Sequence, residues 1–148
     1  MIQIRPMLAE DSDAVSELVA QLGYPSSVLE INKRLQAIQS VSNHVVLVAE
    51  TENGKVRGYI QLSLYPTLNS EPTTYVGGLV VDAEFRGKGI GKLLMKEAEN
   101  WSLSHGYQRL KLTSQMHRTE AHEFYKKLGY KVMKSSYSFA KLLDTQSL

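Results

Sequence analysis

The segment from Val80 to Lys92 constrains this chain more than any other part of its sequence. An apolar run typical of a strand ends at Val81, a loop with glycines at alternate positions follows, and a helical pattern begins at once. The first turn of a helix has backbone N–H groups without intrahelical partners and carries partial positive charge. Glycines let a ligand approach such a backbone closely, so the segment predicts a cradle for a phosphate-bearing anion.

Two common phosphate-binding motifs do not fit this loop. A P-loop requires Ser or Thr after its Gly-Lys pair, and the residue that follows the Gly-Lys pair here is leucine. A dinucleotide fingerprint that starts at Gly87 and Gly89 requires a third glycine where the chain has Lys92. The pattern that fits is Arg86-x-x-Gly89-x-Gly91 after an apolar strand.

This loop resembles the acetyl-CoA pyrophosphate loop of the GNAT superfamily of N-acetyltransferases. A second segment, residues 121–130, reads AHEFYKKLGY and is similar to that family's Ala-x-x-Phe-Tyr-x-x-x-Gly-Phe/Tyr signature. The two segments occur in the expected order with one strand between them. The resemblance is strong over roughly residues 76–132 and extends to the N-terminal half by the order of its elements.

The resemblance implies that acetyl-CoA is the acetyl donor and that no metal is required. The strand that would pair with the pantetheine arm is Leu79-Val80-Val81, and Gly77-Gly78 can supply a bulge that exposes its backbone. The family often has Asn near the end of its fifth strand, and this chain departs from that pattern with Ser114 and His117 as possible substitutes. The full set of expected cofactor-binding residues is Leu79, Val80, Val81, Arg86, Gly87, Lys88, Gly89, Ile90, Gly91, Lys92, Ser114 and His117.

Tyr125 is the catalytic residue that the resemblance implies, because the family places a tyrosine there to protonate the departing thiolate of coenzyme A. A phenol, with an ordinary pKa of about 10, can donate to a developing thiolate whose ordinary pKa is about 8.5. The sequence does not name the general base that deprotonates the amine. A water chain could serve, or one of the candidates Glu71, Asp82, Glu84, His117 and His44.

Hydrophobic periodicity predicts one domain over residues 1–148 with the order β-α-α-β-β-β-α-β-α-β, including one or two final strands within residues 130–142. This is an α+β order. The resemblance implies a GNAT-like mixed, mostly antiparallel central sheet. Helices would flank both faces of that sheet, and its fourth and fifth strands would splay apart.

Charge is unevenly distributed along the chain. Residues 1–85 hold 5 Lys and Arg against 10 Asp and Glu, whereas residues 86–148 hold 12 against 5. A basic half suits the phosphates of coenzyme A and an acidic half suits a cationic amine, although solvated helix faces explain the asymmetry equally well. The chain has no cysteine, which excludes thiolate metal sites and a cysteine nucleophile. The absence of a signal-like N-terminus, a long apolar run and a nucleic-acid motif favours a cytoplasmic protein without membrane or nucleic-acid partners.

The resulting hypothesis is an enzyme that moves the acetyl group of acetyl-CoA to a primary amine by direct attack. The acceptor stays open between a small cationic amine, such as an aminoglycoside or a polyamine, and a protein amine, because one fold hosts many substrates. The alternative is a non-catalytic acetyl-CoA sensor or interaction module. Related proteins often dimerise, so a homodimer is possible.

Overall fold

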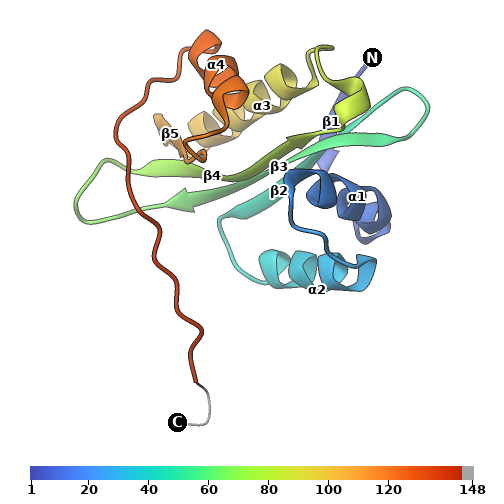
Figure 1. Cartoon of the computed structure of the whole chain (residues 1–148), viewed down its shortest axis with the longest axis horizontal. Helices are drawn as coiled ribbons and strands as arrows, with labels where there is room; N and C mark the ends of the chain where they lie inside the picture. The colour runs from blue at the N-terminus through green and yellow to red at the C-terminus, as the bar shows by residue number, and fades with distance from the viewer. Residues whose placement is uncertain (145–148) are drawn as a thin grey trace. The chain divides into compact units, whose positions relative to one another are not determined.

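The computed structural model describes residues 1–144, which form two compact units. The first unit comprises residues 1–113 and the second begins at Ser114. The first unit contains five strands and three α-helices, shown in Figure 1. In chain order these are β1 (Gln3–Pro6), α1 (Ser12–Leu22), α2 (Val28–Gln39), β2 (His44–Glu50), β3 (Val56–Tyr65), β4 (Thr73–Val81), α3 (Ile90–Ser104) and β5 (Arg109–Leu112).

The five strands form one sheet in the order β1-β2-β3-β4-β5. The first four strands are antiparallel to their neighbours, and β5 is parallel to β4. A turn at residues 52–54 joins β2 to β3, with Gly54 at a φ of 79°. The mixed, mostly antiparallel sheet that the sequence predicts is therefore confirmed.

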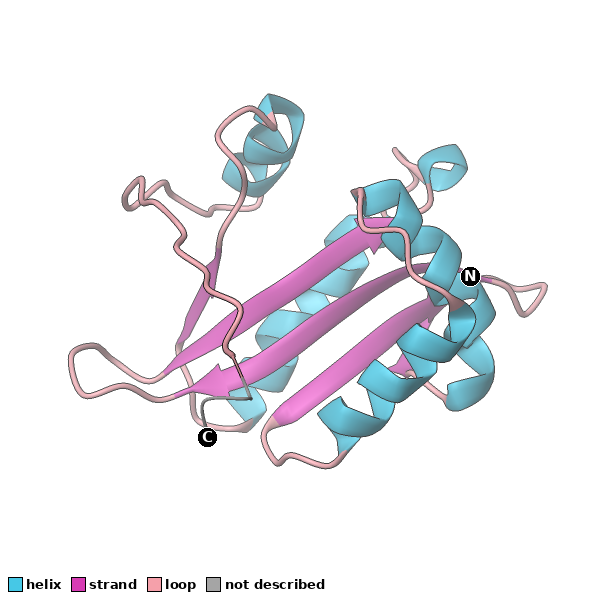
Figure 2. Ribbon diagram, turned by 60° about the horizontal axis from the view of Figure 1, so that its bottom comes forward, coloured by secondary structure: helices cyan, strands magenta, loops and turns pink. Residues whose placement is uncertain are grey.

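Helices cover both faces of this sheet, with α1 and α2 on one side and α3 on the other (Figure 2). Alternation along the strands divides the buried residues between the faces. On the α1 and α2 side, the core cluster includes Leu18, Leu35, Val48, Tyr59 and Val80. The opposite face holds Ile60 and Leu62 of β3, together with the inward residues Ile90, Leu94, Met95 and Ala98 of α3.

The ends of the first two helices follow from local chemistry. Ser27 caps α2, because its hydroxyl accepts a hydrogen bond from the Glu30 N–H at 3.1 Å while the Glu30 carboxylate accepts one from the Ser27 N–H at 2.9 Å. Gly23 ends α1 in the left-handed region, at a φ of 106°. Together these caps fix the turn between the two helices.

The second unit contains α4 (Thr119–Lys127), after which Gly129 has a φ of 95°. Residues 130–144 adopt neither helix nor strand, so the expectation of one or two final strands within residues 130–142 was wrong. The apolar alternation there is real, and Tyr137 and Phe139 are about nine-tenths exposed. A strand also needs a neighbour with which to exchange backbone hydrogen bonds, and the alternation of side chains alone does not supply one.

Candidate functional site

Strand β4 has a free edge over its second half. Its parallel pairing with β5 covers only Thr73 to Val76, opposite Arg109 to Leu112. Residues 77–81 continue past the end of that ladder, and Figure 2 shows the short β5 diverging from β4. This is the splay expected between the fourth and fifth strands. Within residues 1–144 it leaves backbone groups of Leu79, Val80 and Val81 without a strand partner on that side.

A bulge lies at the start of this free edge. Gln61 of β3 pairs with Gly78, whereas the next residue, Leu62, pairs with Val76, so Gly77 is the extra residue. The bulge expected at Gly77-Gly78 is therefore present. A bulged residue leaves the ladder and turns its backbone groups away from the neighbouring strand.

The loop that follows β4 is shaped by two glycines in the left-handed region. After a short 3₁₀ turn over Ala83–Phe85, Gly87 has a φ of 79° and Gly89 has a φ of 85°. A side chain at either position would be strained by the backbone conformation rather than by a lack of space, because no atom lies within 4 Å of a built Cβ. Gly89 is also the N-cap residue of α3.

Backbone donors cluster where the loop enters α3. The first helical hydrogen bond is donated by the Leu93 N–H to the Gly89 carbonyl at 3.0 Å. The amides of Ile90, Gly91 and Lys92 precede it, and these are the groups that a helix start leaves without an intrahelical acceptor. The Ile90 side chain is buried against the sheet, so only its N–H can serve a ligand.

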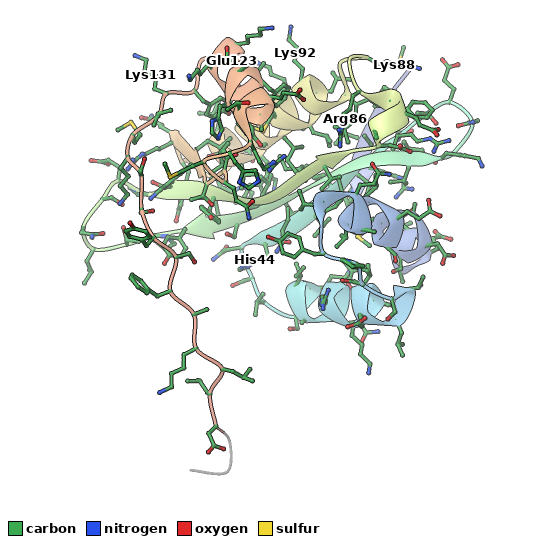
Figure 3. The ribbon with its side chains drawn as sticks, viewed as in Figure 1. His44, Arg86, Lys88, Lys92, Glu123 and Lys131 are labelled. Carbon is green, nitrogen blue, oxygen red and sulfur yellow. The ribbon has the colours of Figure 1, made fainter. Side chains whose placement is uncertain are left out.

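Three cationic side chains surround these amides. Arg86, Lys88 and Lys92 are exposed around the β4–α3 loop and the first turn of α3 (Figure 3). The Arg86 Nε donates to the Val81 carbonyl at 3.4 Å, which places the guanidinium at the end of β4. The Lys88 ammonium lies 4.7 Å from the centroid of the Phe85 ring. The loop thus combines backbone amides with exposed positive charge, which suits a pyrophosphate.

An ion pair on the other side of the loop anchors its first residues. The Asp82 carboxylate accepts a hydrogen bond from Arg57 Nη1 at 3.0 Å and another from the Glu84 N–H at 3.1 Å. The Arg57 guanidinium also lies over the Phe85 ring at 4.3 Å. These contacts commit Asp82 to positioning the loop, which makes it a poor candidate for the general base.

The sequence reasoning missed the role of Arg57, because its position against Asp82 depends on the pairing of β3 with β4. No local pattern signals that pairing. The other general-base candidates of the first unit, Glu71, Glu84 and His44, are exposed. The His44 Nδ1 lies 3.1 Å from the Ser42 carbonyl oxygen.

Tyr125 lies on α4 in the second unit. Burial raises the pKa of its phenol above the ordinary value, with the nearby Arg118 charge opposing the shift. Its ring makes edge contacts with Phe124 and Tyr130, at centroid distances of 5.2 and 6.3 Å. The phenol therefore stays protonated at neutral pH and can act as a proton donor.

The two substitutes expected for the missing Asn also belong to the second unit. Ser114 is half-buried, and within residues 1–144 its hydroxyl has no hydrogen-bond partner. His117 is exposed, and its carbonyl accepts a hydrogen bond from the Thr119 N–H at 3.0 Å. A buried, unpaired hydroxyl at Ser114 is consistent with a ligand contact there, and the assignment of both residues stays a prediction.

Neither a metal site nor a membrane span is found in the described part of the chain. Residues 1–144 contain no group of three or more His, Cys, Asp or Glu side chains arranged to hold a metal ion. Within the same residues, every helix is too short or too polar to cross a bilayer.

Comparison with known proteins adds three findings. The chain is 29% identical to the uncharacterized N-acetyltransferase YhdJ of Bacillus subtilis (strain 168), over 90% of this chain and 89% of that protein. It is 28% identical to the aminoalkylphosphonate N-acetyltransferase of Salmonella typhimurium (strain LT2), over 95% and 91% of the two chains. The solved structure of AAC(6')-Iy in complex with the bisubstrate analog CoA-S-monomethyl-acetylneamine matches with a TM-score of 0.83. That match has 18% identity and covers 97% of this chain and 99% of the other.

These likenesses agree with the geometry of the splayed strand and the glycine loop. Residues 13–130, most of the chain, match the acetyltransferase (GNAT) family over a span that includes β4, the loop, α3 and α4. The chain therefore belongs to the acetyltransferase (GNAT) family.

Proposed function

We propose that this chain transfers the acetyl group of acetyl-CoA to a primary amine of a small molecule by direct attack. The observation that carries the proposal is the continuity of the free β4 edge with the donor-rich start of α3. A ligand with a strand-like amide arm and a pyrophosphate at its end matches this order of groups. Acetyl-CoA is such a ligand, and it also brings the thioester that a direct transfer needs.

The pantetheine arm and the pyrophosphate of acetyl-CoA each match a group of the first unit. The amides of the pantetheine arm pair with the backbone of Leu79 to Val81, as a peptide adds to a sheet edge. The pyrophosphate accepts hydrogen bonds from the amides at the start of α3, with Arg86, Lys88 and Lys92 adding charge. Backbone donors give the position, and the exposed cations mainly increase affinity at low salt.

The transfer itself needs a nucleophile and a proton for the leaving group. The neutral amine attacks the thioester carbonyl, the C–N bond forms, and the C–S bond breaks with the electron pair on sulfur. Tyr125 donates its phenolic proton to that sulfur, while the proton lost by the amine passes to water or to a base. The assignment of Tyr125 rests on the match of α4 to the family signature and on its protonated state.

The acceptor is expected to be small. The aminoalkylphosphonate N-acetyltransferase matches over almost the whole chain, and its name describes a small primary amine with an anionic group. Aminoglycosides and polyamines belong to the same general class of small amines. We propose this class ahead of protein amines, on the strength of that relative alone.

Calorimetric titration tests the donor first. The purified protein is titrated with acetyl-CoA, with ATP and NADH as controls that carry phosphates without the pantetheine arm. We expect saturable binding of acetyl-CoA in roughly the micromolar range, and binding at least about tenfold weaker for the controls. Equal binding of all three compounds, or none, would remove the proposal.

Release of free thiol then tests the transfer. Aminomethylphosphonate, kanamycin and spermidine are supplied with acetyl-CoA, and the thiol is measured with a chromogenic disulfide. Thiol release that depends on one of these amines supports the enzyme. Tight acetyl-CoA binding without release for any amine tested favours the binding-only module instead.

A further inference from the structure

Neither a lack of space nor a left-handed backbone requires glycine at the two positions of the bulge. Gly77 and Gly78 both lie outside the left-handed region that favours glycine. A Cβ built on Gly78 would lie 3.5 Å from the Tyr59 hydroxyl, and one built on Gly77 would lie 3.7 Å from Gln61 Cδ, both ordinary contacts. A glycine inside a strand otherwise costs stability, so these positions point to close approach by a ligand.

Gly58 provides the contrast on the neighbouring strand. A Cβ built there would lie 3.0 Å from the Val80 carbonyl oxygen and 3.2 Å from side-chain carbons of Ile90 and Leu94. Packing under α3 therefore accounts for Gly58. No such crowding accounts for Gly77 or Gly78, which stand at the bulge.

The Tyr59 hydroxyl supplies a second, independent observation. The residue is more than nine-tenths buried within the core, at 8% exposure. Within the part of the chain that the structure describes, no hydrogen bond joins this hydroxyl to another residue, and its oxygen is not among the fully buried atoms that lack a partner, so the hydroxyl end of the ring keeps some access to solvent. Burial of the residue raises the pKa of Tyr59 and keeps its phenol protonated, so the hydroxyl is a hydrogen-bond donor without a protein acceptor. The free donor lies beside the space that the glycine pair leaves open.

The length of the pantetheine arm of acetyl-CoA indicates which of its groups reaches the space beside Gly78. Gly78 lies three positions before Val81, the loop end of β4, which is a distance of about 10 Å along a strand. The pantetheine arm contains about a dozen bonds between its phosphate and its sulfur, roughly 15 Å when extended. With the pyrophosphate at the start of α3, the thioester therefore falls near the glycine pair.

We propose that the Tyr59 hydroxyl donates a hydrogen bond to the thioester carbonyl oxygen of acetyl-CoA, which lies over Gly78 with Gln61 beside it. This inference rests on the proposed function. The carbonyl oxygen gains negative charge when the amine attacks, and a fixed donor at that point stabilises the charge. No proton is transferred in this step, and the phenol keeps its own.

Calorimetry with two ligands and two variants tests the assignment without knowledge of the acceptor. Wild-type protein, Tyr59→Phe and Tyr65→Phe are each titrated with acetyl-CoA and with coenzyme A. Tyr65 is the matched control because it lies on the same strand and is exposed. We expect Tyr59→Phe to weaken acetyl-CoA binding about three- to tenfold and to change coenzyme A binding less than about twofold. Tyr65→Phe should change neither.

Gly78→Ala tests the space independently of the hydroxyl. The added methyl group fits against Tyr59, so the unfolding midpoint should stay within a few degrees of wild type, while acetyl-CoA affinity falls at least about tenfold. Equal effects of Tyr59→Phe on both ligands, or no effect on either, would overturn the inference while leaving the proposed function intact. Wild-type protein that binds neither ligand would instead overturn the proposed function.

Discussion

The β4–α3 loop and helix α4 have different roles in the proposed reaction. The loop would bind the cofactor through its backbone, whereas α4 would donate a proton through one side chain. In the loop, the groups proposed to bind the ligand are backbone amides placed by Gly87 and Gly89, whose φ angles of 79° and 85° disfavour residues with side chains. On α4, the working group is one phenol, and the helix backbone has only to hold it. Burial of Tyr125 raises the pKa of that phenol and keeps it protonated.

This difference predicts opposite responses to substitution. A change of backbone conformation in the loop moves several donors together, whereas removal of one of its exposed side chains removes one screened charge. On α4, the loss of the Tyr125 hydroxyl oxygen is expected to lower turnover and to leave the fold intact. Substitutions in the loop and on α4 can therefore test the two roles separately.

The largest effect is expected for Gly89→Val. Valine is β-branched and strained at a φ of 85°, so the start of α3 must rearrange and its free amides move away from the ligand. We expect acetyl-CoA affinity to fall at least about a hundredfold, measured by calorimetry on protein whose circular dichroism shows it to be folded.

Gly106→Val is the matched control for this variant. Gly106 follows the other end of α3 at a φ of 77°, and a built Cβ there also meets no atom within 4 Å. Gly106→Val introduces the same kind of backbone strain as Gly89→Val, but at a place where no backbone amides are proposed to bind the ligand. Both variants should lose similar stability, and only the loop variant should lose affinity. Equal affinities would show that the loop does not bind the pyrophosphate.

The features of the loop could be predicted from sequence because they are local. An apolar strand, alternating glycines and a helical pattern occupy consecutive residues, and the positive φ angles fall on two of those glycines. The bulge at Gly77-Gly78 was also among the expectations, because glycines inside a strand often mark a bulge.

The second largest effect is expected for Tyr125→Phe. This change removes the proton donor and keeps the ring that packs against Phe124 and Tyr130. Turnover should fall at least about tenfold, while acetyl-CoA affinity stays within about twofold of wild type. Steady-state thiol release and calorimetry on the same preparations give the two values.

Tyr137→Phe is the control for the loss of a phenol in the same unit, because Tyr137 is 90% exposed. It should match wild type in both measurements. Unchanged turnover in Tyr125→Phe would show that another group protonates the sulfur. Helix α4 would then have no catalytic role to compare with the binding role of the loop.

What the sequence did not reveal depends on contacts between distant segments. Arg57 meets Asp82, and Tyr59 covers Gly78, only because β3 pairs with β4 in one register. Residues 130–142 mislead in the opposite direction. Their alternation is typical of a strand, yet no partner strand pairs with them in the described structure, and a strand pattern does not name its own neighbour.

A smaller effect is expected for Arg86→Ala. The side chain is exposed and makes one long contact with the Val81 carbonyl, so its contribution is mainly a screened attraction to the pyrophosphate. Acetyl-CoA affinity should fall about three- to tenfold at low ionic strength, and the difference from wild type should largely vanish at about 0.5 M salt. A loss as large as that of Gly89→Val, independent of salt, would show that side chains and not the backbone dominate the loop.

The smallest effect is expected from a change of pH. Measuring turnover and acetyl-CoA affinity against pH tests α4 and the loop separately without any substitution. Because burial raises the pKa of Tyr125, the phenol keeps its proton as the pH rises past the ordinary tyrosine value of about 10. Turnover at saturating amine should therefore not decline between about pH 8 and pH 10, and the alkaline loss should begin above that range. Affinity for acetyl-CoA should change little there, since the backbone amides that position the pyrophosphate do not titrate and the exposed cations add only a screened attraction. A turnover decline centred below about pH 9 with unchanged affinity would assign the leaving-group proton to a group more acidic than Tyr125.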